Sequence, residues 1–256
     1  MKSLTDAHIH IDITQEKPVM EFLSAMRSSS IQRAVLIINT IDEAEALIRE
    51  KELIEKSRNI TLVAGMNFHW SNPREIYDKI NNIGKCVSIK IHPLLYNCIA
   101  EDTDSIVDTI KLFNEKEIKN VVIDTLFNDE YIDNHIGIEL GIRIAREFPS
   151  LSVILAHSGS TRLLECIAFT RNIRNIYYDL SFVSTYFNNT SLRYDMINYL
   201  KYTSDRMMFG SDYPSFSIQK ALESLYDLCQ EAQLSEEQID NVFDNTVRIV
   251  YNFEEE

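Results

Sequence analysis

Short apolar runs alternate with amphipathic segments along the whole chain. The runs are rich in Val, Ile and Leu, a composition that favours β-strands. In the clearest run, from Ala34 to Ile38, every position is apolar, which is typical of a parallel strand covered on both faces. On this basis we predict eight strands, at Leu4–Ile9, Ala34–Asn39, Thr61–Asn67, Val87–Ile91, Asn120–Thr125, Ser152–His157, Ile176–Leu180 and Met207–Ser211.

The segments between these strands carry apolar residues at the spacing i, i+3, i+4, i+7, which predicts amphipathic helices. The spacing is clearest at Val19–Met26, Ile106–Phe113, Ile138–Ala145 and Ala221–Leu228. Strand–helix units repeated in series predict a single α/β domain over residues 1–256, a (β/α)8 TIM barrel. The alternative is a doubly wound open sheet, which normally has a glycine-rich phosphate-binding turn after its first strand. Here the first strand ends in histidines instead.

Net charge and cysteine content limit the kinds of partner and the compartment that we expect. The net charge of −14 argues against nucleic acid and against an anionic membrane surface, because both require clustered Lys and Arg. No apolar stretch is long enough to span a bilayer, and no charged-then-apolar leader precedes the first strand. The scattered cysteines form no C-x-x-C motif, so we expect reduced thiols and a cytoplasmic protein. We therefore expect a small-molecule substrate, and the fold is compatible with a homodimer.

Histidines gather at the predicted strand ends, where the active sites of TIM barrels lie. His8 and His10 are two residues apart on the first strand, so both imidazoles project from the same face and form half of a metal site. Five of the six histidines lie at strand ends, whereas His135 precedes a helix and is expected to face solvent. We expect Asp179 to accept hydrogen bonds rather than to act in catalysis. The other polar residues at strand ends are Asp6, Asn67, Lys90, Asp124, Ser181 and Asp212.

Short sequence words follow the predicted strand ends in order. They are D-A-H-I-H at the first strand, I-K-I-H-P at the fourth, I-L-A-H-S-G at the sixth, Y-Y-D-L-S at the seventh and F-G-S-D-Y-P at the eighth. Together with the closing D-N-T-V-R-I-V-Y, these words resemble the amidohydrolase superfamily. Within it, they resemble the amidohydrolase-related branch of metal-dependent TIM-barrel hydrolases, lactonases and decarboxylases. The resemblance runs from Asp6 to Tyr251 and covers nearly the whole chain.

The resemblance implies roles for individual residues. His8, His10 and Asp212 match metal ligands, and His157 matches either a ligand or a catalytic imidazole near the metal. Lys90 would line the substrate pocket. One position departs from the family pattern, because the fifth strand typically ends in a histidine ligand and here ends in an aspartate.

That aspartate, Asp124, can ligate the same ions as a histidine. We therefore expect one divalent ion, held by His8, His10, Asp124 and Asp212. Zinc is the first expectation for such a site. A second carboxylate favours harder ions such as Mn²⁺, and Fe²⁺ is a further candidate. The alternative is that the change to Asp124 has abolished metal binding.

These residues predict a metal-dependent hydrolase that cleaves a small anionic ester, lactone or amide with an activated water. Asp212 would take the proton from the water, and His157 would stabilise the oxyanion. Lys90, His92 and His69 would bind the substrate, although the two histidines could instead only cap their strand ends. A non-oxidative decarboxylase could use the same site. A further alternative is a barrel that has lost metal and catalysis and now only binds a ligand.

Overall fold

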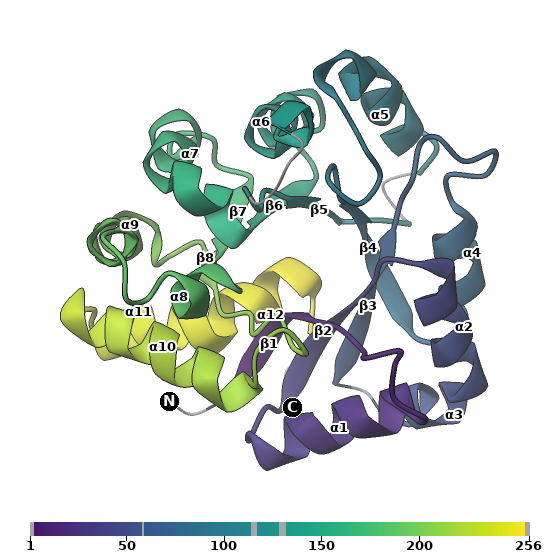
Figure 1. The fold of residues 1–256 in the computed structure, drawn as a ribbon, viewed down its shortest axis with the longest axis horizontal. Coiled ribbons are helices and arrows are strands. Elements are labelled where there is room, and N and C mark those ends of the chain that lie inside the picture. The colour runs from purple at the N-terminus through teal and green to yellow at the C-terminus, as the bar shows by residue number, and fades with distance from the viewer. Residues whose placement is uncertain (1–2, 58, 114–116, 128–131, 254–256) are drawn as a thin grey trace.

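Eight parallel strands form a single sheet in the computed structural model, which describes residues 3–57, 59–113, 117–127 and 132–253. The order of the strands in the sheet is their order along the chain, and helices surround them on the outside (Figure 1). The strands are β1 Thr5–Ile9, β2 Arg33–Ile38, β3 Ile60–Gly65, β4 Lys85–Ile91, β5 Asn120–Asp124, β6 Ser152–Ala156, β7 Ile176–Asp179 and β8 Met207–Met208.

The last strand approaches the first and closes the barrel. Ala7 donates its backbone N–H to the carbonyl of Phe209 at 2.8 Å, and an isolated bridge pairs Ile9 with Tyr213. The predicted (β/α)8 barrel is thus confirmed. The predicted bounds differ from the observed ones by three residues at most, at the end of β8. That strand ends early because Phe209 turns its backbone N–H to the carbonyl of Val242.

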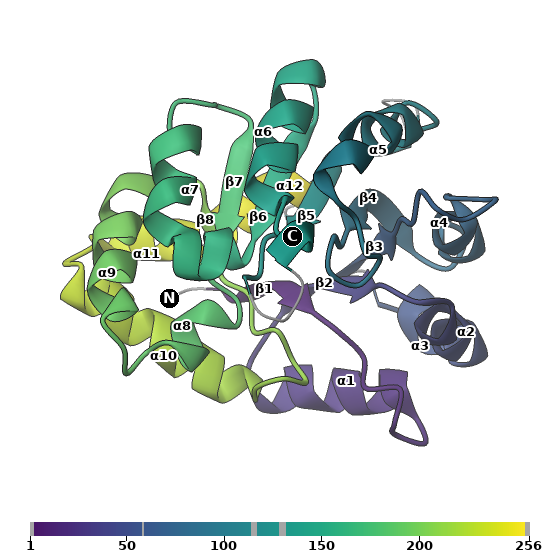
Figure 2. The same cartoon turned by 45° about the horizontal axis from the view of Figure 1, so that its top comes forward.

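Helices connect the strands and cover the outer face of the barrel (Figure 2). The four predicted helices correspond to α1 (Pro18–Ser28), α5 (Thr103–Ile110), α6 (Gly137–Glu147) and α10 (Ile218–Glu231). The α-helices are α1 Pro18–Ser28, α2 Ile41–Arg49, α3 Lys51–Glu55, α4 Glu75–Ile80, α5 Thr103–Ile110, α6 Gly137–Glu147, α7 Leu163–Thr170, α8 Val183–Tyr186, α9 Leu192–Thr203, α10 Ile218–Glu231, α11 Glu236–Asp240 and α12 Thr246–Tyr251. None of these described helices has both the length and the apolar character needed to cross a membrane.

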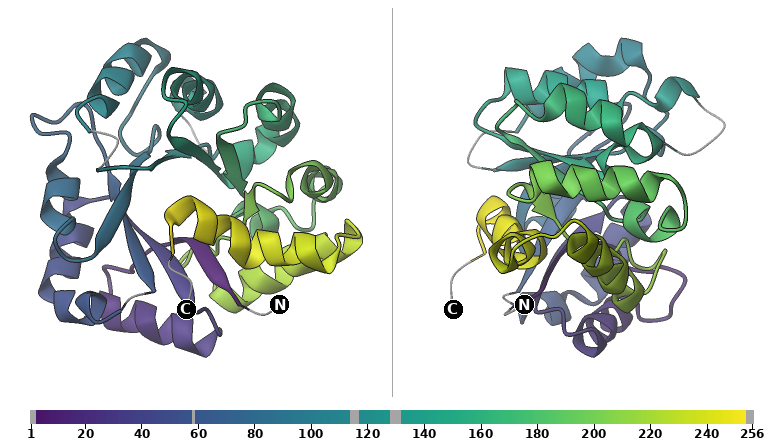
Figure 3. Two further views of the ribbon diagram at one scale, coloured as in Figure 1. Left: turned by 180° about the vertical axis from the view of Figure 1, so that it is seen from behind. Right: turned by 90° about the vertical axis from the view of Figure 1, so that its left-hand side faces the viewer.

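Strand side chains alternate between two apolar cores. On β2, Leu36 belongs to the large cluster that strands share with helix residues such as Phe22, whereas Val35 and Ile37 belong to a smaller cluster inside the barrel. The helix α12, seen from behind in Figure 3, contributes Tyr251 to that inner cluster. This alternation explains why the strands are apolar on both faces.

The four cysteines are buried and free. Burial raises the pKa of each thiol to about 12, so the reactive thiolate is scarce at neutral pH. We expect the native protein to react with a thiol reagent such as DTNB only as fast as it unfolds, and to release four equivalents in denaturant. Rapid labelling of the folded protein would contradict this expectation.

Candidate active site

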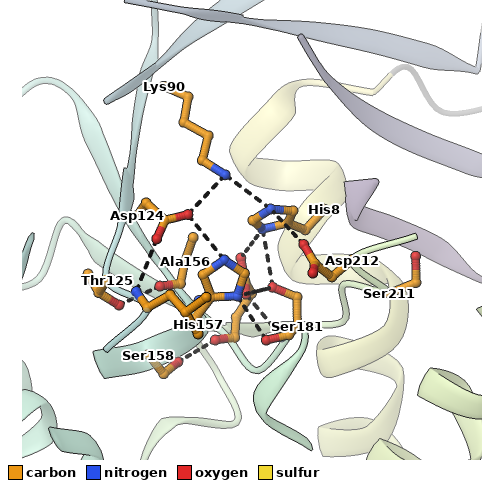
Figure 4. Close-up of polar contacts among 12 residues, drawn as sticks. His8, Lys90, Asp124, Thr125, Ala156, His157, Ser158, Ser181, Ser211 and Asp212 are labelled. Carbon is orange, nitrogen blue, oxygen red and sulfur yellow. Dashed lines mark hydrogen bonds and ion pairs between the residues drawn. The ribbon is translucent and has the colours of Figure 1, made fainter. Parts of the chain in front are cut away.

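The predicted metal and catalytic residues converge at the carboxyl ends of the strands, and Figure 4 shows His8, Asp124, His157 and Asp212 among them. Carboxyl ends of parallel strands meet at one edge of a barrel, so residues far apart in sequence become neighbours there. Two of these side chains are almost fully buried, with 0% exposure for His8 and 1% for Lys90. The contributing residues are His8 and His10 from β1, Lys90 from β4, Asp124 from β5, His157 after β6 and Asp212 after β8.

His8 and His10 are held so that their Nε2 atoms are left for a ligand. The Nδ1 of His8 donates to Oδ2 of Asp179 at 3.1 Å, and the Nδ1 of His10 donates to the carbonyl of Ile37 at 3.2 Å. A neutral imidazole carries one proton, so these bonds place the lone pair on Nε2. Burial and the ammonium of Lys90 lower the pKa of both rings, which keeps them neutral.

Asp212 faces these two nitrogens. Its Oδ1 lies 3.5 Å from Nε2 of His8 and 3.8 Å from Nε2 of His10. The backbone of Asp212 has a φ of 56°, a left-handed conformation that aspartate adopts more readily than most residues. Gly210 makes the approach possible, because a Cβ there would lie only 2.6 Å from the Cβ of His8. The missing side chain at Gly210 therefore lets the segment after β8 bring the carboxylate of Asp212 close to β1.

The side chains of His8, His10 and Asp212 fit one metal ion. Their ligand atoms all lie within 4.8 Å of one another. Two imidazole nitrogens and a carboxylate oxygen suit Zn²⁺, Mn²⁺ or Fe²⁺, and the oxygen partners of both Nδ1 atoms orient the rings as in known metal sites. A second group, His8 with His157 and Asp179, meets the same distance limit. In that group His157 has an oxygen acceptor at each ring nitrogen and therefore no lone pair left for a metal, so we favour the first.

Asp124 lies among basic groups outside that set. Its Oδ2 is 3.2 Å from Nζ of Lys90, 3.2 Å from Nε2 of His157 and 3.4 Å from Nε2 of His92. The Nζ of Lys90 is in turn 3.3 Å from Nε2 of His8 and so bridges the two (Figure 4). Burial alone would raise the pKa of Asp124, but these neighbours hold it well below its ordinary value. The role of Asp124 as a fourth metal ligand stays a prediction.

His157 is the cationic imidazole of the site. Its Nδ1 donates to the carbonyl of Ser181 at 2.9 Å, and its Nε2 faces Oδ2 of Asp124 at 3.2 Å. A ring with an acceptor at each nitrogen needs both protons. Burial alone would lower the pKa of His157, but the carboxylates of Asp124, Asp212 and Asp179 raise it to about 9.

The chain from His157 to Ser160 keeps a positive φ at all four residues. Such conformations are costly for residues other than glycine and persist where the surroundings enforce them, often at functional sites. Here Gly159 donates its backbone N–H to Oγ1 of Thr125 at 2.7 Å, and the backbone N–H of His157 donates to Oδ1 of Asp179 at 3.0 Å. These bonds fix the imidazole at the end of β6.

Asp179 and Ser181 connect the residues His8 and His157 through hydrogen bonds. Oδ1 of Asp179 accepts the backbone N–H groups of His157 and Ser181, so the predicted acceptor role is confirmed. The hydroxyl of Ser181 lies 3.2 Å from Nδ1 of His8 and 3.0 Å from Nδ1 of His157. From the sequence, Ser181 was expected at a strand end but had no predicted role. A serine alone does not indicate which side chains its hydroxyl will contact.

Asp6 is a second residue whose part became visible only in the fold. Its Oδ1 accepts the backbone N–H groups of His8 and Ser211, both at 3.0 Å, and so joins β1 to the segment that follows β8. Its Oδ2 is buried without a hydrogen-bond partner. Burial raises the pKa of Asp6 to about 7.

Two of the three predicted substrate-binding residues, Lys90 and His92, reach the site. Nδ1 of His92 accepts the backbone N–H of Leu95 at 3.2 Å, so the neutral ring presents its Nε2–H to Asp124. Burial lowers the pKa of His92 to about 4, which favours this neutral form.

The remaining two histidines lie elsewhere. His69 is exposed, and its backbone N–H donates to the side chain of Asn67. No contact of its ring with the cluster occurs in the described part of the chain, so its role in substrate binding stays a prediction. For His135, the expectation of a solvent-facing ring was wrong. Both its nitrogens are buried, because the ring packs against Phe127 with the centroids 3.7 Å apart.

The family model described as Amidohydrolase matches residues 120–253, which is just over half of the chain. That stretch includes the ends of β5, β6, β7 and β8 and therefore Asp124, His157, Asp179 and Asp212. No curated protein matches the chain.

Solved structures share the fold over nearly the full length. An uncharacterised TIM-barrel protein from Bordetella bronchiseptica has a TM-score of 0.73 at 14% identity, with 98% of each chain covered. An amidohydrolase from Burkholderia multivorans has a TM-score of 0.69 at 12% identity, with 98% of this chain and 100% of that chain covered. A probable 2-pyrone-4,6-dicarboxylic acid hydrolase from Acinetobacter baumannii has a TM-score of 0.63 at 11% identity, with the same coverage. Likeness at such low identity supports the fold alone.

Proposed function

Because the chain belongs to the amidohydrolase family of enzymes, we propose that it is a metal-dependent hydrolase that cleaves a small anionic ester, lactone or amide. The observation that carries this proposal is the convergence of His8, His10 and Asp212 with their ligand atoms within 4.8 Å of one another. A divalent ion held by these three side chains would make water a better nucleophile and polarise a carbonyl group. Zinc is the ion we expect, with manganese and iron as alternatives.

The side chains of the protein supply the proton transfers. Asp212, which is 9% exposed at the barrel mouth, takes the proton from the attacking water. His157 carries two ring protons and gives one to the oxygen or nitrogen that accumulates charge as the bond breaks. Asp124 supports this role by stabilising the protonated ring.

Buried cations favour a substrate with an anionic group. With a divalent ion in place, the charges of the ion, Lys90 and His157 together exceed those of the three neighbouring carboxylates. Those carboxylates are Asp124, Asp179 and Asp212. Electrostatic attraction is strong in a site shielded from water, so a small anion is drawn toward Lys90 and His157.

Metal content provides the first test. We expect about one ion per chain in protein purified without chelator, in keeping with a single-ion site. The ion should be lost in a His8→Ala/His10→Ala double variant and retained in His69→Ala, which removes an exposed histidine outside the cluster. Elemental analysis measures both. Absence of an ion after reconstitution with Zn²⁺ or Mn²⁺ would contradict the proposal.

The class of reaction is tested with a substrate panel. We expect turnover of small lactones, esters or amides that carry a carboxylate, measured as proton release in weakly buffered solution. Aromatic carboxylates are tested alongside, with release of CO₂ as the signal. CO₂ release without hydrolysis would replace the hydrolase with a decarboxylase that uses the same residues.

A further inference from the structure

A cavity lies at the carboxyl ends of β2, β3 and β4, at the same edge of the barrel as the histidine cluster. Its volume of about 360 Å³ is at the lower end of the range for small-ligand pockets. The segments that follow three neighbouring strands form its walls. The lining residues are Thr40, Ile41, Asp42, Asn67, Trp70, Leu95 and Tyr96.

Tyr96 ties this cavity to the backbone that positions His10. The hydroxyl of Tyr96 donates to the carbonyl of Asn39. Asn39 is two residues beyond Ile37, whose carbonyl orients the ring of His10. Gly65 provides the room, because a Cβ at this position would lie 2.7 Å from the carbonyl oxygen of Asn39 and 2.9 Å from the hydroxyl of Tyr96. The wall of the cavity is therefore packed against the backbone segment that orients the ring of His10.

Aromatic rings and one carboxylate determine the chemistry of the cavity. The rings of Trp70 and Tyr96 meet edge to face, with centroids 5.9 Å apart and planes at 67°. Asp42, exposed in the first turn of α2, is the only charged residue among the described residues of the lining. Aromatic faces and a carboxylate both attract cations, and none of the described side chains in the lining carries a positive charge. In this respect the cavity differs from the histidine cluster, which contains the cations Lys90 and His157.

We propose that this cavity binds the non-reacting end of the substrate, and that this end is a flat apolar group that carries an ammonium or a similar cationic donor. The assignment rests on the proposed function, because it describes the substrate of that same hydrolase. The apolar part packs against Trp70, Tyr96 and Leu95, while the cationic donor faces Asp42. The substrate then has an anionic or carbonyl end at the histidine cluster and a cationic end at β2 to β4.

Trp70 makes the cavity directly observable, because it is the single tryptophan of the chain. We would titrate the protein with benzylammonium, benzyl alcohol and benzoate, which share one ring and differ in charge, and follow tryptophan fluorescence. We expect a saturable change in which benzylammonium binds about two- to fivefold more tightly than benzyl alcohol, the range for a solvent-exposed ion pair. Benzoate should bind most weakly. Equal affinities for all three probes, or a change that does not saturate, would overturn the proposal.

Single substitutions test whether Asp42 causes the preference for benzylammonium. Asp42→Asn should remove the difference between benzylammonium and benzyl alcohol, whereas Glu45→Gln, at an exposed position on the same helix outside the lining, should leave it unchanged. Leu95→Arg should weaken benzylammonium and strengthen benzoate, because it adds a cation to the lining. A preference that persists in Asp42→Asn, or that Glu45→Gln removes equally, would overturn the assignment.

The fluorescence titration and the metal analysis can contradict the two proposals separately. Binding of the probes requires neither an ion nor turnover. Charge-selective binding in a protein that holds no ion would overturn the proposed hydrolase and leave the cavity as a binding site for cations. One ion per chain with no selective probe binding would support the hydrolase and overturn the inference about its substrate.

Discussion

Asp212→Asn is expected to lower kcat/KM at least about a thousandfold, because the substitution removes the base that takes the proton from water and weakens the metal site. The fold should survive. Asparagine tolerates the left-handed backbone at this position better than any other replacement except glycine, and it keeps the size of the aspartate side chain. Steady-state kinetics on the best substrate of the panel, together with circular dichroism, measure the two effects.

Asp205→Asn is the matched control, since it makes the same substitution at an exposed position. We expect its kcat/KM and its melting temperature to equal those of the wild type. Metal content should be measured in the same samples. A fully active Asp212→Asn variant would remove Asp212 from the mechanism, whereas an inactive variant that still holds the ion would assign its main role to proton transfer.

Asp124→Asn is expected to lower the free energy of unfolding by about 3 kcal/mol, because it leaves the buried charges of Lys90 and His157 without their shared carboxylate. For a protein of this size the loss corresponds to a fall in melting temperature of about 6–12 °C. Chemical denaturation with urea provides the measurement. Asp104→Asn is the control, since it removes a carboxylate whose ion pair with Arg143 is exposed to solvent, and exposed pairs contribute little to stability.

The pH dependence gives a second signature of the same substitution. The pKa of His157 is raised to about 9 in the folded protein, above its ordinary value of 6.5. The stability that this shift provides is complete below pH 6.5 and is lost as the pH rises through 9. Asp124→Asn should flatten this decline. Metal content of the variant tests the fourth-ligand prediction as well, because loss of the ion would place Asp124 in the metal site.

Much of the fold was predictable because its signals are local. The apolar runs set the strands, and the spacing of Val19, Phe22 and Met26 predicted a helix that became α1. The shortest strand, β8, was the least accurate, because its end depends on a backbone contact with Val242, more than thirty residues further along the chain. Distant contacts of this kind leave no pattern in the local sequence.

The sequence by itself determined the barrel and the set of polar residues at its mouth, because strand order and strand ends follow from local periodicity. Only the tertiary structure decided how these residues divide. His8, His10 and Asp212 form one group, while Asp124 lies with Lys90 and His157. The division depends on distances of a few ångströms between separate strands and on which ring nitrogen carries a proton. Both are set by packing between distant segments, such as the missing Cβ at Gly210 that admits His8.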